Sequence, residues 1–231
     1  MSAPVTAWVP ELRPAQALLI ACTLAAGLPL DMLSDFAGQT ALGVAVWAVM
    51  LGVIGRYPAR ARWTLLACLS IATAGELLLS LDWGLYAYRL GNVPLYVPPG
   101  HVLLLLLGLA LARRMTDAVA RAIVGGAAAY TIAAAIAGFD TFGIALFLVL
   151  VAAWAIMPSQ RRLFASTFVL ALALEVCATQ LGNWAWSAQV PGTILVTTNP
   201  PGASGAFYCV LDMLVALALA AGVPRVAARP A

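Results

Sequence analysis

The sequence contains no lysine, one histidine and very few charged residues. Of 231 residues, 9% are charged and 64% are apolar, which leaves too few polar side chains to cover a water-soluble globule. The absence of lysine excludes a retinal Schiff base and a lysine nucleophile. The single histidine excludes the histidine clusters of di-iron membrane oxygenases and a bis-histidine haem within one chain. The four cysteines lack metal-ligand spacing. We therefore expect no metal and no cofactor.

Long apolar segments are what the sequence has in abundance. Each is near the roughly 20 residues that cross a bilayer core, and the fourth reaches that length if its helix starts around Pro98. The segments cover residues 17–33, 38–55, 63–81, 102–112, 118–137, 141–157, 163–181 and 204–223. The sequence therefore predicts an all-α integral membrane protein with eight transmembrane helices.

The twelve basic residues are all arginine, and their positions predict the orientation in the membrane. Short cytoplasmic loops accumulate positive charge, so the side with most arginines is expected to be cytoplasmic. With the amino terminus inside, only Arg89 lies outside. The eleven on the cytoplasmic side are Arg13, Arg56, Arg60, Arg62, Arg113, Arg114, Arg121, Arg161, Arg162, Arg225 and Arg229. We expect a multi-pass protein of a bacterial-type inner (plasma) membrane with both termini in the cytoplasm. The small positive balance requires no nucleic-acid partner.

The chain has an internal similarity with a period of about a hundred residues. One series of positions recurs at an offset of 99 or 100: Pro58, Arg62, Glu76 and Ser80, then Pro158, Arg161, Glu175 and Thr179. Both series continue into a long loop with tryptophan, Gly-Asn and Pro-Pro-Gly. These features predict two four-helix repeats, residues 1–114 and 115–231. Because four is even, the repeats run in parallel, and loops 82–100 and 182–202 share the outer face.

Three acidic residues fall inside predicted membrane helices, where an ionisable group is costly and often functional. They are Glu76, Glu175 and Asp212. Ser80 and Thr179 follow the two glutamates by four residues, so we expect each hydroxyl to lie within hydrogen-bonding range of its carboxyl group. The acids are either proton donors to an apolar substrate or interhelical polar clamps. Asp31, Asp35 and Asp140 fall in short outer loops and are expected to be solvated.

Aromatic and amide residues gather in the two long loops. They either form an interfacial belt or line a cavity in which their rings stabilise a cation. His101, at the start of the fourth predicted helix, is a proton shuttle, one axial ligand or a locally bonded side chain. The candidate substrate-binding residues are Trp83, Tyr86, Tyr88, Asn92, His101, Asn183, Trp184, Trp186 and Asn199.

An acidic residue in a helix, an aromatic-x-aromatic element and a later proline occur in both halves. The elements are Glu76, Tyr86-Ala87-Tyr88 and Pro94, then Glu175, Trp184-Ala185-Trp186 and Pro191. With the parallel repeats, this arrangement resembles integral-membrane carotenoid enzymes, namely lycopene cyclases of two fused cyclase domains and carotenoid hydratases of the bacterioruberin pathway. Small membrane-bound terpene cyclases are a looser comparison.

The resemblance implies that a buried acid protonates an isoprenoid alkene, and that aromatic and carboxylate groups stabilise the cation. Water or an internal alkene then completes hydration or cyclisation. Glu76 is the leading acid, with Glu175 or Asp212 as the second carboxylate. The expected partner is membrane lipid or an isoprenoid substrate. The alternatives are a lipid or small-molecule transporter and a non-catalytic subunit of a membrane complex. The sequence leaves the oligomeric state open.

Overall fold

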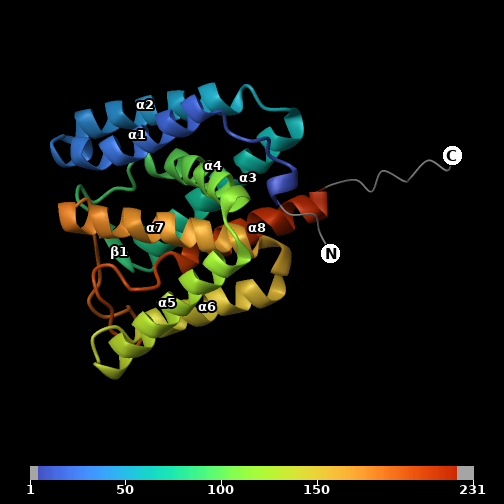
Figure 1. Ribbon diagram of the computed structural model, residues 1–231. Coiled ribbons are helices and arrows are strands. Elements are labelled where there is room, and N and C mark those ends of the chain that lie inside the picture. The colour runs from blue at the N-terminus through green and yellow to red at the C-terminus, as the bar shows by residue number, and fades with distance from the viewer. Residues whose placement is uncertain (1–4, 223–231) are drawn as a thin grey trace.

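The computed structural model describes residues 5–222 of the chain, and its secondary structure is almost entirely helical (Figure 1). The prediction of an all-α fold with eight helices is confirmed for this part of the chain. The end of the last predicted segment, at residue 223, lies outside the described residues, as do Arg225 and Arg229. The helices are α1 (Pro14–Met32), α2 (Phe36–Ile54), α3 (Ala59–Glu76), α4 (Val97–Arg114), α5 (Asp117–Ile136), α6 (Phe142–Ile156), α7 (Arg161–Leu181) and α8 (Ala206–Gly222).

The helices have the length and composition of membrane spans. Six of them are long and apolar enough to cross a bilayer: α1, α2, α3 with its continuation to Asp82, α4, α5, and α7 with the preceding turn from Pro158. The apolar helices α6 and α8 are shorter. Many large apolar side chains also remain exposed on the outer surface, as expected where lipid rather than water surrounds a protein. The chain is therefore a multi-pass membrane protein.

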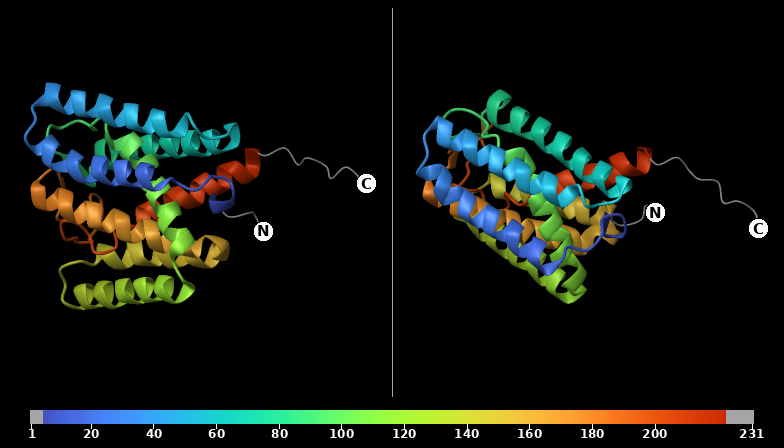
Figure 2. Two further views of the ribbon diagram at one scale, coloured as in Figure 1. Left: turned by 45° about the horizontal axis from the view of Figure 1, so that its top comes forward. Right: turned by 90° about the horizontal axis from the view of Figure 1, so that it is seen from above.

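Four helices form the centre of the molecule, and one helical hairpin packs on each side of it. Helices α3, α4, α7 and α8 contact one another in a ring, with α4 against α7 and α3 against α8. The α1–α2 hairpin packs on α4, and the α5–α6 hairpin packs on α7 and α8 (Figures 1 and 2). This order explains why α4 and α7 are the most buried of the spanning helices, whereas α1 and α5 face outward along most of their length.

A glycine permits the close approach of the two central helices α4 and α7. A Cβ atom added at Gly108 would lie 2.4 Å from Cγ2 of Thr167, so no larger residue fits without movement of the helices. The Ser166 hydroxyl donates a hydrogen bond of 2.8 Å to the Gly108 carbonyl oxygen across the same contact. Small residues and hydroxyl groups of this kind are typical of helix interfaces inside membranes, where the backbones must approach closely.

The two long loops pair with each other through a short antiparallel sheet. Helix α3 continues as a π-helix, η2 (Leu77–Asp82), and strand β1 (Tyr86–Tyr88) follows; β2 (Trp184–Trp186) follows α7. In the pairing, Tyr86 lies opposite Trp186, and Tyr88 lies opposite Trp184. The two loops are therefore structured. The sheet itself was not predicted, because the aromatic spacing of two was attributed to a belt or a cavity lining.

Two of the three aspartates that were expected to be solvated are buried, so this prediction was wrong for them. Asp31 and Asp140 are both 0% exposed. Asp31 lies in the last turn of α1, and Asp140 accepts hydrogen bonds from the backbone N–H groups of Gly143 and Gly202. Asp35 instead caps α2 by accepting from the N–H of Gly38. Burial of these carboxylates requires the polar donors that the folded loops bring to them.

Candidate functional site

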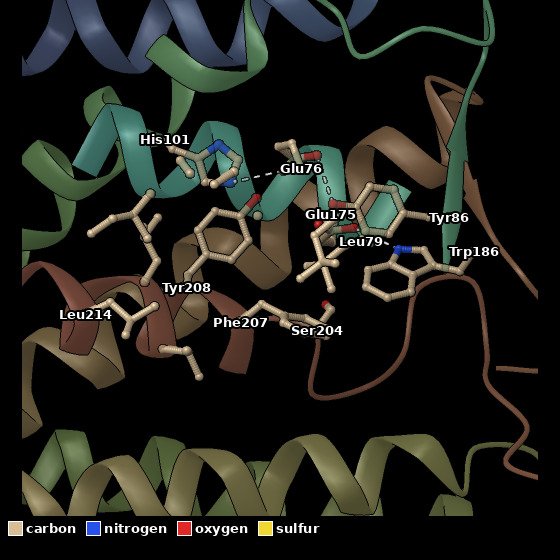
Figure 3. Close-up of a pocket in the computed structure, with 17 residues that line it drawn as sticks. Glu76, Leu79, Tyr86, His101, Glu175, Trp186, Ser204, Phe207, Tyr208 and Leu214 are labelled. Atoms are coloured by element: carbon tan, nitrogen blue, oxygen red, sulfur yellow. Dashed lines mark hydrogen bonds and ion pairs between the residues drawn. The ribbon is translucent and has the colours of Figure 1, made fainter. Parts of the chain in front are cut away.

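A cavity of about 390 Å³ lies beside the two-stranded sheet, between α3 and α8 (Figure 3). Glu76 and Glu175 both line it, so the fold brings together two carboxyl groups that are 99 positions apart in the sequence. Leu78 and Leu214 also line the cavity and are 55% and 41% exposed. Since these leucines stand on the outer surface of η2 and α8, the cavity can be reached from the side of the molecule that faces lipid.

The Glu76 carboxylate is held by the two tyrosines of β1. Both phenol groups donate to the same oxygen, Oε2, from 2.8 Å for Tyr86 and 2.6 Å for Tyr88. Burial, together with the negative charge of Glu76, raises the pKa of both tyrosines above the ordinary phenol value. They therefore remain protonated hydrogen-bond donors at neutral pH.

The Glu175 carboxylate has the same arrangement with different donors. The indole N–H groups of Trp184 and Trp186 both donate to Oε2, from 2.8 and 3.0 Å. An indole N–H can only donate, so Oε2 must act as an acceptor. Any proton on this carboxyl group therefore resides on Oε1, which has no hydrogen-bond partner among the described residues. The strand that follows each glutamate thus fixes which oxygen is available for chemistry.

The predicted pairing of each glutamate with the hydroxyl four residues later was wrong. The Thr179 hydroxyl donates to the backbone carbonyl oxygen of Glu175, at 2.8 Å, and not to its carboxyl group. The Glu76 carboxyl group accepts instead from the two tyrosines of β1. Ser80 lies within η2, where the wider π-helical turn changes the α-helical spacing on which the predicted pairing depended. A threonine inside a helix commonly donates to a backbone carbonyl oxygen of the preceding turn, as Thr179 does. The two carboxyl groups are bonded instead by donors from the strands that follow them.

His101, near the start of α4, is placed to exchange a proton with Glu76. Its Nδ1 lies 3.0 Å from the carbonyl oxygen of Val97, which can only accept, so Nδ1 carries a hydrogen. Its Nε2 lies 3.4 Å from Oε1 of Glu76. The imidazole ring and the Glu76 carboxyl group are thus close enough to exchange a proton. The ring also stacks on Tyr208, with centroids 4.9 Å apart.

Aromatic rings form part of the remaining wall of the cavity, among aliphatic side chains. Tyr86 and Trp186 pack with ring centroids 4.9 Å apart, and Phe207 lies 6.1 Å from Trp186. Tyr86 and Trp186 are 7% exposed each, so these loop aromatics line the cavity and do not form an interfacial belt. Rings around an apolar cavity can stabilise a transient cation by their negative faces.

Helix α8 and the turn before it, which contains Ser204, contribute residues that the sequence reasoning missed. Ser204, Phe207, Tyr208 and Leu211 line the cavity, and their spacing of three, four and seven residues is the signal that could have identified them as one helical face. The Ser204 hydroxyl is buried and has no partner within residues 5–222. A buried hydroxyl without a partner is where a water molecule or a polar group of a ligand is expected.

Other candidate residues lie away from the cavity. Asp212 is buried, and its Oδ2 accepts from the Thr167 hydroxyl at 2.8 Å, on the part of α8 that packs against α7. Asn92 and Asn183 belong to a polar cluster around Asp31 and Gln39. Asn199 supports β2, because its Oδ1 accepts from the backbone N–H of Trp186. Tyr88 and Trp184 pack against each other behind the residues that line the cavity. Trp83 is a surface residue and is 37% exposed.

A second, smaller cavity of about 60 Å³ lies behind the His101–Tyr208 ring pair, since both residues line it as well. Trp184 and the α1 residues Leu24 and Gly27 form other parts of its wall. Within the described residues, no group of three or more histidine, cysteine, aspartate or glutamate side chains is placed to hold a metal ion.

Comparison of the chain with protein families, with curated proteins and with solved structures finds no match.

Proposed function

We propose that this chain is a membrane-embedded enzyme that acts on a hydrophobic isoprenoid, a carotenoid or terpenoid, by protonating an alkene, with cyclisation or hydration as the outcome. The observation that carries the proposal is the pair of glutamates in one apolar cavity, each with one oxygen held by two aromatic donors. The resemblance to carotenoid cyclases and hydratases supports the same chemistry.

In the proposed reaction, Glu76 is the acid. Its proton, carried on Oε1 beside His101, transfers to one alkene carbon, so that a C–H bond forms and a cation remains on the neighbouring carbon. The two tyrosine donors on Oε2 stabilise the carboxylate left behind, and Glu175 with the surrounding rings stabilises the cation. Water, or a second alkene of the same molecule, adds to the cation, and loss of a proton from the resulting cation ends the reaction. The proton released in that step returns to Glu76 through His101.

The position of the cavity suits such a substrate. Exposed leucines of η2 and α8 flank it, so a lipid-soluble molecule can enter from the bilayer without crossing water. The catalytic groups lie at the inner end of this opening, where Glu76 is 7% and Glu175 is 6% exposed. Exclusion of bulk water protects a cation from premature capture.

The repeat prediction is part of the same proposal, with residues 1–114 and 115–231 as two parallel four-helix units. The sheet register supports it, because the pairing is symmetric about Ala87 and Ala185. Each glutamate accepts from both aromatic residues of the strand that follows it in sequence. Asp35 and Asp140 also each accept from the backbone N–H of a glycine three residues later, at the start of α2 and of α6.

We further propose a bacterial-type plasma membrane and a cytoplasmic position for the arginine-rich end of the bundle. Nine of the ten described arginines lie at the end formed by the start of α1, the α2–α3 and α4–α5 connections and the start of α7. Arg89 lies at the opposite end, beside Asp31. This orientation places the sheet and the two glutamates toward the outer half of the membrane.

The test is replacement of Glu76 by glutamine. Glu76→Gln keeps an oxygen that accepts from the tyrosines but has no proton to transfer, so turnover of an isoprenoid should fall by about 10²–10⁴-fold while the protein stays folded. Glu11→Gln is the matched control, because Glu11 is exposed and pairs with Arg114. Lipid that co-purifies with the protein supplies the substrate to assay. A fully active Glu76→Gln variant would sink the assignment.

A transporter is the second candidate, and the cavity behind His101 and Tyr208 is the observation that favours it. In a proton-coupled carrier, a ring pair of this kind between two cavities, with a glutamate beside it, would separate the two sides of the transport path. Proton-dependent uptake of a lipid into vesicles, lost in Glu76→Gln, distinguishes this function, because the substrate would then leave chemically unchanged.

A further inference from the structure

A polar cavity at the arginine-rich end of the molecule has no place in the proposed reaction. Its volume is about 230 Å³, and its wall consists of Ala112, Arg113, Ser159, Gln160, Arg162 and Leu163. These residues come from the last turn of α4, the short 3₁₀ helix η3 (Pro158–Gln160) and the first turn of α7. The cavity is thus far along the bundle from the sheet and the glutamates, which stand at the opposite ends of α3 and α7.

The charges around this cavity favour an anion. Two guanidinium groups line it, from Arg113 and Arg162, and no acidic side chain does. Arg113 donates to the Val9 carbonyl oxygen, and Arg162 uses Nε to bind Asp117 at 2.7 Å. A guanidinium group has five N–H donors in total, so the Asp117 bond leaves others on Arg162. The amino end of α7 adds the positive end of its helix dipole.

The second observation is a buried amide group. Gln160 is 2% exposed, and its Oε1 accepts from the N–H of Val5 at 3.3 Å. Because a backbone N–H needs an acceptor, this contact fixes which end of the amide is oxygen and leaves Nε2 as the other end. Nε2 has no hydrogen-bond partner among residues 5–222, and the Gln160 side chain makes no capping hydrogen bond to α7, although Gln160 is its N-cap residue. A buried donor without an acceptor is costly, and an acceptor bound in the cavity would remove that cost.

We propose that this cavity binds the phosphate group of an anionic phospholipid. The guanidinium groups and the Gln160 amide would donate to the phosphate oxygens, as arginine and amide donors do at other phosphate sites. A lipid is the source because the cavity lies at the ends of the membrane helices α4 and α7, at the level of lipid headgroups. Basic pockets between membrane helices are the known setting for headgroup recognition.

The sharpest test is Gln160→Glu in the full-length protein. Glutamate keeps an oxygen that accepts from the Val5 N–H and places a negative oxygen where Nε2 was, so the fold is preserved and an anion is repelled. Gln16→Glu is the matched control: Gln16 also accepts from a backbone N–H, that of Arg13 at 3.0 Å, at the same end of the molecule but outside the cavity. Arg162→Gln is a second variant, which removes one guanidinium group and only an exposed ion pair.

Binding is measured by native mass spectrometry and by thermal unfolding in mild detergent with added phosphatidylglycerol, phosphatidylcholine or inorganic phosphate. We expect phosphatidylglycerol to remain bound and to raise the unfolding temperature of the wild type and of Gln16→Glu. Gln160→Glu and Arg162→Gln should each bind it at least tenfold more weakly. Equal binding of phosphatidylglycerol by Gln160→Glu would overturn the proposal, as would equal effects of phosphatidylcholine. Stabilisation by inorganic phosphate alone would overturn the lipid assignment.

Discussion

The buried polar cluster around Asp31 predicts a large loss of stability when its charge is removed. The carboxylate of Asp31 is 0% exposed and accepts from Gln39 Nε2 and Asn183 Nδ2, both at 2.7 Å. Arg89 lies 3.7 Å away from Oδ1 and also donates to the carbonyl oxygens of Asp31 and Ser34. The Asp31 side chain therefore joins α1 to α2 and to the loops that follow β1 and α7.

The change Asp31→Asn keeps the volume but leaves one acceptor oxygen in place of two. One of the two amide donors then loses its acceptor, which costs about 1.5–3 kcal/mol for a bond to a charged group. Arg89 also loses its counter-charge, worth at most about 4 kcal/mol at this separation and less because the Arg89 side chain is 22% exposed. We expect the free energy of unfolding to fall by about 2–4 kcal/mol.

Unfolding of the purified protein by heat or by sodium dodecyl sulfate, followed by circular dichroism, measures this loss. A double-mutant cycle with Arg89→Gln isolates the ion pair, for which we expect a coupling of about 1–3 kcal/mol. Asp117→Asn is the control, because Asp117 pairs with Arg162 on the exposed surface. A loss for Asp31→Asn within about 0.5 kcal/mol of zero would refute the reasoning, since surface substitutions commonly have effects of that size.

Two other predictions concern the site and the helix packing. Tyr88→Phe removes one of the two donors to Glu76, a bond to a charged group worth about 1.5–3 kcal/mol, so turnover should fall by about 10–100-fold. Tyr57→Phe is its control, because the Tyr57 hydroxyl has no partner within the described residues, and equal rates for the two variants would contradict the role of Tyr88. In Gly205→Ala, the new Cβ would lie 2.4 Å from the Phe168 carbonyl oxygen, so thermal unfolding should show a loss of about 1–3 kcal/mol. Gly126→Ala should cause no loss, since open space surrounds that position; similar losses in both would show that packing at Gly205 is not tight.

The sequence predicted most of the fold, because a bilayer leaves few choices. Backbone groups must be paired inside each span, so apolar runs of the right length become helices whatever their neighbours are. The predicted boundaries of the sixth segment, 141–157, differ from those of α6 by one residue at each end. The burial of Asp31 and Asp140 could not be predicted from the apolar runs. Both residues fall near helix ends, where burial of a carboxylate depends on the hydrogen-bond donors that distant loops supply.

The sequence singled out the two glutamates of the candidate site but not their geometry. Glu76 and Glu175 could be recognised because a charged group within an apolar run is conspicuous. Their donors could not, since Tyr88 and Trp184 are 12 and 9 residues away along the chain and reach the carboxylates only through the sheet. Asp212 has equal prominence in the sequence, yet its partner, Thr167, holds it outside the cavity.

By itself, the sequence determined that this protein is a helical membrane protein, because hydrophobicity and helix length are local properties that the bilayer converts directly into spans. Only the tertiary structure decided that two glutamates 99 residues apart share one cavity and which oxygen of each is available. It also decided that a lone histidine, His101, stands beside one of them. These facts depend on the pairing of two loops and on the packing of α3, α4, α7 and α8, which are contacts between distant residues that no local pattern specifies.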